Sequence, residues 1–404
     1  AWPVSAQSGA VVEKTARDLF AIYGYEEIRT PALEETSLFI RSIGGQTDIV
    51  QKQMYSFKDR GGRDVTLRPE GTAPVARAYL EHRLGGARPI CKLYYVGPMF
   101  RNERPQAGRL RQFHQIGAEA IGSRSAYLDA ELVILMLEIL NACGLQNPEL
   151  KINSLGCEKD KKRFEQILKK SLTGQIGGFC EDCGKRYDGN ILRIFDCKNE
   201  ICRRQILSAP RISDSLCAEC APHFDEIKAV LDGSGIRYTV EPRLVRGLDY
   251  YTGMVFEATH ESLGSQDAVA AGGRYDNLIA QMGSDKTPAC GFAIGIDRLL
   301  MAAKDAESPA RARPRLFLIC LGHEAQTKGF KILCGLRKKG VACQMGFGEK
   351  SLKSQMRLAG RLNAQRVLII GEEELKTGRG ILRDMENKQQ KEIGLEDVTD
   401  PHLW

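Results

Sequence analysis

Two extended runs joined by an arginine-rich connection constrain the fold of this 404-residue chain more than any other feature. Residues 92–101 and 112–121 have the composition of β-strands, and Pro, Gly and Arg are concentrated between them. Such a pair predicts an antiparallel β-hairpin with a long loop. Further strand patterns, which we also expect to pair antiparallel, occur at residues 238–245, 252–259, 268–271 and 290–294.

The second run of the hairpin has one polar face. Side chains alternate along a strand, so residues 114, 116, 118 and 120 form a mostly apolar face while Gln115 and Glu119 share the other with Phe113, Gly117 and Ile121. A purely structural strand would more often place Val or Thr at such positions. We therefore expect a polar ligand to be held on the face of Gln115 and Glu119.

The arginines of the hairpin favour a phosphate-bearing ligand. Arg101 ends the first run, and Arg104, Arg109 and Arg111 crowd the connection. Guanidinium groups bind phosphate oxygens bidentately and stay charged at any working pH. A solvated basic loop is the alternative interpretation. The chain has neither a Gly-x-x-x-x-Gly-Lys-Ser/Thr loop nor a Gly-x-Gly-x-x-Gly turn, so arginines would replace the usual glycine-rich phosphate cradle.

Two more segments combine charge with aromatic or helical features. Residues 246–253 hold one guanidinium, one carboxylate and two phenols between strand patterns. Residues 291–299 pass from a strand through Gly into a helix, which places Arg298 in the first helical turn, where anions are favoured.

The chain is long enough for two or three domains. Residues 159–233 differ from their surroundings, being charged, helical in pattern and rich in cysteine, and we interpret them as a helical insertion. Residues 311–314 predict a linker. Beyond it, strand patterns at 316–321, 341–345 and 367–370 alternate with helical patterns at 324–339 and 351–364, which predicts a separate α/β domain.

The composition of the chain indicates the cellular compartment in which we expect it. The chain shows no basic segment followed by an apolar run at its start and no long apolar stretch, so we expect neither secretion nor membrane insertion. Thirteen cysteines without a signal peptide favour a reducing compartment, and we expect a cytoplasmic location. The net charge is +7, and residues 314–404 contribute most of it with 16 basic and 11 acidic residues.

At this point the motifs resemble those of a known family. Residues 100–104 through 111–115 look like motif 2 of the class II aminoacyl-tRNA synthetases, 295–298 look like motif 3, and 27–44 resemble motif 1, the dimer element. Residues 68–72 and 246–253 are similar to the two signatures of the histidyl-tRNA synthetase family. The resemblance implies an α+β fold: an antiparallel-sheet catalytic domain (1–158 and 234–312), the helical insertion (159–233) and an α/β anticodon-binding domain (314–404).

The resemblance also implies the site residues. Arg101 and Arg246 would serve catalysis at the α-phosphate. ATP would contact Arg101, Glu103, Arg109, Phe113 and Arg298. Histidine would contact Glu70, Thr72, Arg101, Gln115, Glu119, Arg246, Tyr250, Tyr251 and Tyr275.

The activity implied is ATP-dependent ligation of histidine to tRNA(His) through histidyl-adenylate, by a homodimer that uses ATP with Mg²⁺ and binds neither DNA nor membranes. One alternative is a non-enzymatic relative that binds histidine and regulates ATP phosphoribosyltransferase, although such regulators usually lose signature residues and the anticodon domain. A second is a class II synthetase for another amino acid, such as threonine, glycine or proline.

The C-terminal part carries a basic helix pattern. Lys350, Lys353, Arg357 and Arg361 are spaced by three and four, with Leu352, Met356 and Ala359 on the opposite side. A solvated amphipathic helix is the alternative, but the resemblance to an anticodon-binding domain favours RNA contact. Gln106 in the hairpin loop is a further candidate for RNA contact.

Six cysteines of the insertion occur in pairs: 180 and 183, 197 and 202, 217 and 220. Such spacing suits tetrahedral Zn²⁺. The expected ligand set is Cys180, Cys183, Cys217 and Cys220, with Cys197 and Cys202 in place of the last two as the competing set. Free or buried thiols without metal are the third interpretation.

Overall fold

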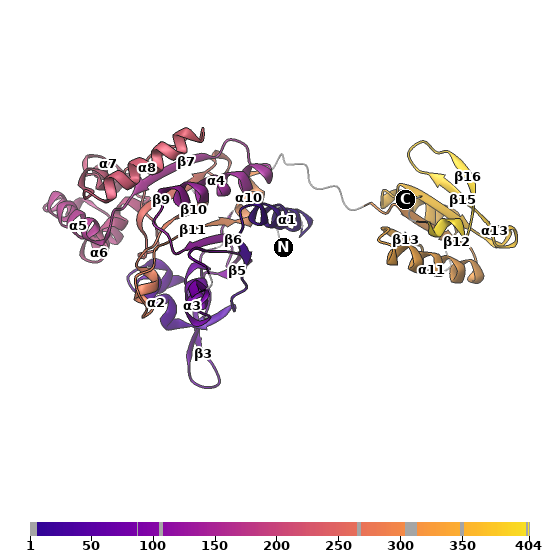
Figure 1. Ribbon diagram of the computed structural model, residues 1–404, viewed down its shortest axis with the longest axis horizontal. Coiled ribbons are helices and arrows are strands. Elements are labelled where there is room, and N and C mark those ends of the chain that lie inside the picture. Colours follow the sequence, from indigo (N-terminus) through magenta and orange to yellow (C-terminus); the bar gives the residue numbers. More distant parts are fainter. Residues whose placement is uncertain are drawn as a thin grey trace. The chain divides into compact units, whose positions relative to one another are not determined.

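The computed structural model describes residues 6–86, 88–104, 108–264, 268–303, 313–347, 351–400 and 403. The chain divides into two compact units, residues 1–306 and 307–404 (Figure 1). Residues 311 and 312 of the predicted linker 311–314 lie outside the described residues.

An eight-stranded sheet organises the first unit, in the order β1-β5-β6-β11-β10-β9-β7-β8. Its five central pairs are antiparallel, whereas the outer pairs β1–β5 and β7–β8 are parallel. The strands are β1 (Glu26–Glu27), β5 (Cys91–Phe100), β6 (Gln112–Ile121), β7 (Glu149–Ser154), β8 (Thr239–Val240), β9 (Thr252–Thr259), β10 (Ala268–Arg274) and β11 (Ala289–Gly295). The predicted hairpin is confirmed as β5–β6, with Gly97 opposite Gln115 and Leu93 opposite Glu119.

Helices cover one face of this sheet (Figure 1). They are α1 (Ala6–Ile22), α4 (Ala126–Ala142), α8 (Cys220–Gly233) and α10 (Ile296–Ala302). The apolar face of β6 meets them through Ile116 and Ala118, and α4 is apolar nearly all round because it is packed between the sheet, α1 and α8. Phe20 of α1 stacks on Tyr94 of β5 with ring centroids 4.4 Å apart. The polar face of β6 is thereby left for the opposite side of the sheet.

The other face of the sheet carries the elements that surround the candidate site. A small antiparallel sheet, in the order β2-β4-β3, packs beside two helices. These elements are β2 (Leu33–Glu35), β3 (Tyr55–Lys58), β4 (Asp64–Leu67), α2 (Thr36–Ile43) and α3 (Thr72–Glu81), with a π-helical turn at Ile49–Gln53, a 3₁₀ turn at Leu84–Gly86 and the short helix α9 (Leu278–Gln281). Arg68, which follows β4, donates to the carbonyls of Pro98 and Thr30 at 3.0 and 2.8 Å and so ties this region to β5.

The segment between β7 and β8 is almost wholly helical. It contains α5 (Glu158–Leu172), α6 (Glu181–Asp188), α7 (Glu200–Gln205) and α8, with 3₁₀ turns at Ile176–Gly178, Ile191–Asp196, Ile206–Ser208 and Ile212–Ser215. Phe164, Leu168 and Ile194 of this segment are fully buried and continue the core on this side of the sheet.

The second unit is a five-stranded sheet with helices. Its order is β13-β12-β14-β15-β16, parallel across the first three strands and antiparallel beyond. The elements are β12 (Leu316–Cys320), α11 (His323–Lys338), β13 (Cys343–Met345), α12 (Leu352–Arg361), β14 (Arg366–Ile370), α13 (Glu372–Thr377), β15 (Arg379–Asp384) and β16 (Gln390–Gly394). One core lies on each face of the sheet.

Several sequence expectations need correction. The strand pattern at 238–245 yields only β8, because the chain turns away after Val240. On α12, Leu352 is exposed and Gln355 is buried, since Gln355 can donate to the carbonyl of Cys320 at 3.4 Å. The hairpin β15–β16 has no counterpart among the predicted strands, because its residues are mostly polar.

Candidate active site

A cavity opens on the polar face of β6, on the side of the sheet away from α4. Nearly all the predicted ATP and histidine residues line it: Glu70, Thr72, Arg101, Glu103, Arg109, Phe113, Gln115, Arg246, Tyr250, Tyr251 and Arg298. Glu119 and Tyr275, the two exceptions, lie behind the lining and contact it through Thr72 and Tyr250. The fold thus gathers residues from segments far apart in sequence.

The acidic end of the cavity begins at Glu70. Its two carboxylate oxygens accept hydrogen bonds from the backbone N–H groups of Thr72 (2.7 Å) and Ala73 (2.9 Å), at the start of α3. A carboxylate at that position satisfies N–H groups that the helix leaves free and favours the positive end of the helix dipole. Burial nevertheless raises the pKa of Glu70 above its usual value, because loss of water outweighs these hydrogen bonds.

Glu119 is held by two hydroxyl groups. The Thr72 hydroxyl donates to its Oε1 at 2.7 Å, and the Tyr275 phenol donates to Oε2. Gly291 lies opposite on β11, and a Cβ there would stand 1.8 Å from Glu119 Oε2, so only glycine leaves room for the carboxyl group. Burial raises the pKa of Glu119 to about 8, and the nearby Glu70 adds to the rise.

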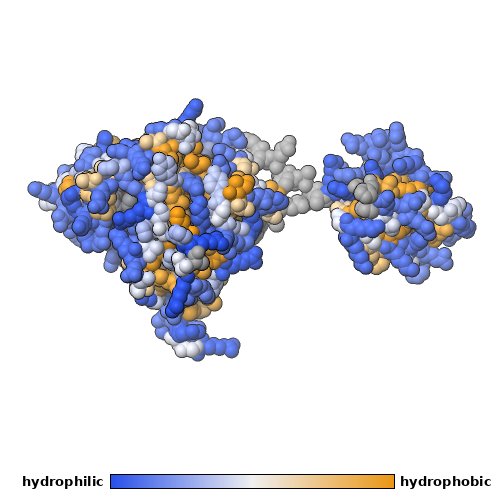
Figure 2. Space-filling model, in the orientation of Figure 1, coloured by the Kyte–Doolittle hydropathy of each residue, from blue (hydrophilic) through white to orange (hydrophobic). Residues whose placement is uncertain are grey.

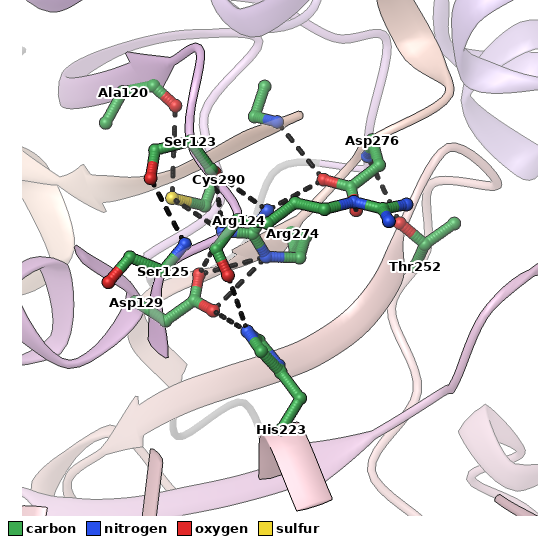
Figure 3. Close-up of polar contacts among 11 residues, drawn as sticks. Ala120, Ser123, Arg124, Ser125, Asp129, His223, Thr252, Arg274, Asp276 and Cys290 are labelled. Carbon is green, nitrogen blue, oxygen red and sulfur yellow. Dashed lines mark hydrogen bonds and ion pairs between the residues drawn. The ribbon is translucent and has the colours of Figure 1, made fainter. Parts of the chain in front are cut away.

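A buried ionic network fixes the residue next to Tyr275. Arg274 lies between Asp129 and Asp276, with nitrogen-to-oxygen distances of 3.0 and 2.8 Å (Figure 3). His223 reaches Asp129 from α8 at 3.5 Å, and Asp276 accepts the backbone N–H of Ala289 at 3.1 Å. Because Tyr275 is held between two residues of this network, its phenol is directed at Glu119.

Aromatic side chains close the acidic end. Tyr250 packs against Tyr251 (centroids 4.7 Å apart) and edge-on against Tyr275 (5.6 Å). Tyr95 of β5 completes the group and was missed from the sequence. Its ring fills the space above Gly71 and Gly117, where a Cβ would lie within 2.3 Å of it. The signal was available: a tyrosine on one hairpin strand faces a glycine on the other.

The basic end of the cavity is formed by three arginines and a phenyl ring. Arg101 donates to the Pro69 carbonyl at 2.9 Å and lies over the Phe113 ring, 5.3 Å from its centroid. Arg109 pairs with Glu103 at 3.2 Å. Arg298 donates to the carbonyls of Gly108 and Ala268 at 3.1 and 2.6 Å, which directs it along the wall of the cavity.

Arg246 enters from another side. It forms an ion pair with Glu257 of β9, a second residue that the sequence analysis missed. Its Nε is buried and has no hydrogen-bond partner among the described residues, and the same holds for Oε1 of Gln115. A donor and an acceptor left in this state within a cavity are available to a ligand.

The six paired cysteines of the insertion fall into two groups, and this overturns the expected set of zinc ligands. One group consists of Cys180, Cys183, Cys197 and Cys202. The other consists of Cys157, Asp160, Cys217 and Cys220. Within each group the possible ligand atoms lie within 4.8 Å of one another. The expected combination of the first and third pairs is therefore wrong, because the 3₁₀ turn at Ile191–Asp196 brings the second pair to the first. The competing set is the one that the fold assembles.

The predicted RNA-binding residues are only partly described. Lys353, Arg357 and Arg361 are exposed on α12, and Ala359 is buried on its opposite side. Lys350 and Gln106 lie outside the described residues.

Comparisons with known proteins agree with this geometry. The family model described as histidyl-tRNA synthetase matches residues 2–159 and 201–299, and the anticodon binding domain model matches 315–400. The histidine–tRNA ligase of Syntrophotalea carbinolica is 47% identical over 396 residues, covering 98% of this chain and 94% of that protein. That of Geobacter sulfurreducens is 48% identical over 384 residues, covering 95% and 92%.

Solved structures give the same result. The structure of apo S. aureus histidyl-tRNA synthetase superposes with a TM-score of 0.83 at 35% identity, covering 98% of this chain and 96% of that chain. An ATP phosphoribosyltransferase regulatory subunit/histidyl-tRNA synthetase from Bacillus halodurans, at 20% identity and a TM-score of 0.61 with 90% and 94% coverage, shares the fold alone.

Sheet, cavity and C-terminal unit together define a class II aminoacyl-tRNA synthetase, an enzyme that uses ATP to join an amino acid to tRNA. The predicted fold class is confirmed. The chain belongs to the histidyl-tRNA synthetase family, and its activity is the ligation of histidine to tRNA. The two alternatives considered from the sequence, a synthetase for another amino acid and a purely regulatory relative, are therefore excluded.

Proposed function

We propose that the acidic end of the cavity binds histidine and that the basic end binds ATP. One observation carries this assignment: a single cavity places the Glu70–Thr72–Glu119 cluster and its phenols next to Arg101, Arg246 and Arg298. Carboxylates and phenols suit an ammonium group and an imidazole, whereas guanidinium groups suit a triphosphate.

The histidine pocket has distinct parts. Glu70 would accept the α-ammonium group, and Glu119, backed by Tyr275, would accept an imidazole N–H. The free Oε1 of Gln115 lies between the acidic and basic ends and would accept a further N–H of the substrate. Tyr250 and Tyr251, both buried, would border the ring.

ATP would occupy the other end. Phe113 offers an aromatic face for the adenine, Glu103 an acceptor for its amino group, and Arg109 and Arg298 positive charge for the terminal phosphates. Mg²⁺ would accompany the triphosphate, because a divalent cation screens its charge and prefers phosphate oxygens.

Catalysis would rest on positioning and charge. A carboxylate oxygen of histidine attacks the α-phosphorus, an O–P bond forms, and the bond to the pyrophosphate oxygen breaks. No general base is needed, because the carboxylate is already a nucleophile. Arg101 and Arg246 would stabilise the negative charge that develops on the α-phosphate oxygens. In the second step the tRNA 3′-terminal hydroxyl attacks the histidyl carbonyl, and AMP leaves.

The remaining assignments concern the whole protein. We assign catalysis to residues 1–158 and 234–312, the insertion to 159–233, and anticodon binding to 314–404, with Lys353, Arg357 and Arg361 facing RNA. A homodimer through residues 27–44 is supported by Leu33 and Ile40, which are 48% and 45% exposed there. No helix within the described ranges has the length and apolar character to cross a membrane. None of the thirteen cysteines, each of which the structure describes, is in a disulfide bond, which fits a reducing cytoplasm.

A structural zinc ion would be held by Cys180, Cys183, Cys197 and Cys202. The Sγ atoms of Cys180 and Cys197 are 3.7 Å apart, close to the separation of about 3.8 Å that two sulfurs have in a tetrahedral zinc site. The backbone N–H of Cys180 donates to Cys202 Sγ at 3.2 Å, a contact that stabilises a thiolate. Four sulfur donors in this arrangement fit Zn²⁺.

Amino-acid-dependent exchange of pyrophosphate into ATP tests the assignment of the two ends. With each of the twenty amino acids supplied in turn, only histidine should support exchange, and Glu119→Ala should raise the KM for histidine more than that for ATP. Exchange with another amino acid, or an equal rise in both KM values, would overturn the assignment.

A further inference from the structure

The second cysteine group lies where the helical insertion joins the catalytic sheet. Cys157 follows β7 and is the N-cap of α5, and Cys217 and Cys220 stand at the start of α8. Asp160, in the first turn of α5, completes the group, and the four ligand atoms lie within 4.8 Å of one another. The chain therefore passes the cluster once as it leaves β7 and again just before α8, which packs on α4.

We propose that Cys157, Asp160, Cys217 and Cys220 bind a second structural zinc ion, which fastens the start of α5 to the start of α8. The spacing Cys-x-x-Asp and Cys-x-x-Cys supplies two short chelating pairs from two different segments, the usual plan of a closed tetrahedral site. The site shares no ligand with the four-cysteine group and does not depend on it.

Asp160 is held in the orientation of a ligand. Its side chain is fully buried, its Oδ2 accepts the backbone N–H groups of Cys157 (3.3 Å) and Cys217 (3.2 Å), and its Oδ1 contacts Arg163 at 2.9 Å. A carboxylate offers about four lone-pair sites, so these three contacts leave one on Oδ1 for a metal. Such outer contacts are what orient carboxylate ligands in metal sites.

Positive charge from two helix N-termini and one guanidinium is directed at the cluster. Helices α5 and α8, of 15 and 14 residues, both begin at the cluster. The positive end of a helix dipole, at its N-terminus, favours a thiolate. Arg163 adds a guanidinium. Gly156 has φ +64, and a Cβ there would lie 2.6 Å from Asp160, so the glycine allows the chain to turn tightly around the site.

The cluster is coupled to the catalytic sheet through short hydrogen bonds. Gly156 and Leu155 exchange backbone bonds with Gly253 at 2.8 and 2.7 Å. Lys161, one residue after Asp160, donates to the carbonyl of Tyr251 at 3.2 Å. A metal at the start of α5 would therefore fix the backbone that carries the pocket tyrosines.

Metal content of the purified full chain tests the proposal. Elemental analysis should find two zinc ions per chain in the wild type and in the control Cys334→Ser, whose cysteine lies in neither group. The double variant Cys217→Ser/Cys220→Ser should keep one, as should Cys180→Ser/Cys183→Ser. A wild type without zinc overturns the second site, and so does a Cys217→Ser/Cys220→Ser variant that keeps all the zinc of the wild type.

A measurement on the unchanged chain covers the case in which these variants fail to fold. Cys157, Cys217, Cys220 and Cys334 are all half-buried. Alkylation mapped by mass spectrometry should modify Cys334 at once and the other three only after a chelator is added. Equal reactivity before chelation, or a disulfide between Cys217 and Cys220 in the protein as purified, overturns the proposal.

Discussion

Glu119 illustrates how far one side chain depends on its surroundings. Its place on the polar face of a strand follows from the sequence, but its chemistry comes from residues brought by other elements: Thr72, Tyr275 and Gly291. A carboxyl group that is buried beside another carboxyl group resists ionisation. The pKa of Glu119 therefore depends both on whether the chain is folded and on the residues that line the pocket.

Stability should depend on pH through Glu119. Its folded pKa of about 8 lies above the ordinary value of 4.5, so the folded chain keeps a proton that the unfolded chain releases. The stabilisation is complete below pH 4.5 and is lost as pH rises through 8, at no more than about 1.4 kcal/mol per pH unit. Urea unfolding of the wild type and Glu119→Gln between pH 5 and pH 8 should show a steeper decline for the wild type. Parallel curves would contradict the raised pKa.

Arg246 should act on the chemical step. Arg246→Ala should lower the rate of adenylate formation by about 10²–10³-fold, because charge on the α-phosphate loses a guanidinium partner. Single-turnover kinetics should show this with little change in histidine affinity. Arg203→Ala, an equal truncation at an exposed position of α7, is the control. An effect on KM alone would contradict the assigned role.

At the scale of elements, the hairpin β5–β6 was predicted from strand composition and the arginine-rich connection, and its polar face indeed turns to the cavity. The sequence did not show which side chains contact each residue of the site. Glu257 belongs to β9, whose neighbours are set by sheet order, which alternation within one strand does not reveal. Tyr95 differs, because it faces Gly117 within the predicted hairpin.

The basic face of α12 gives a prediction at this scale. Lys353→Glu/Arg357→Glu should weaken tRNA binding and lower the dependence of log affinity on log salt by about one unit per lost phosphate contact. Pyrophosphate exchange should stay unchanged, since the pocket lies in the other unit. Lys328→Glu/Lys331→Glu on α11, with the same charge change at exposed positions, is the matched control. An equal loss in both variants would mean that general charge, rather than α12, governs binding.

At the scale of the whole molecule, apolar patches are visible on the largely hydrophilic surface of the catalytic unit (Figure 2). Ile40 projects from α2 and Phe57 from β3, with 45% and 48% of each side chain exposed. Both stand in or beside residues 27–44. Exposed apolar side chains that recur in one region favour an interface.

The wild type should have twice the chain mass in solution, and Ile40→Asp should lower it to one chain, because a carboxylate at an interface loses its water. Light scattering on a sizing column measures this directly. Ile201→Asp, at a similarly exposed apolar residue of α7 (53%), should leave the mass unchanged. A monomeric wild type, or an unchanged mass for Ile40→Asp, would contradict the dimer proposal.

Local patterns along the chain predicted the hairpin, the alternation of the C-terminal α/β unit and the motifs of the family, because periodicity and motif spacing are local properties. Three further facts emerge only from the folded chain: which cysteines lie together, the burial of Gln355 rather than Leu352 on α12, and the partners that hold Glu119, Arg246 and Tyr275. These facts depend on sheet order and on turns between distant segments. A residue's spacing along the chain therefore predicts its face, but the packing of other elements sets its chemistry.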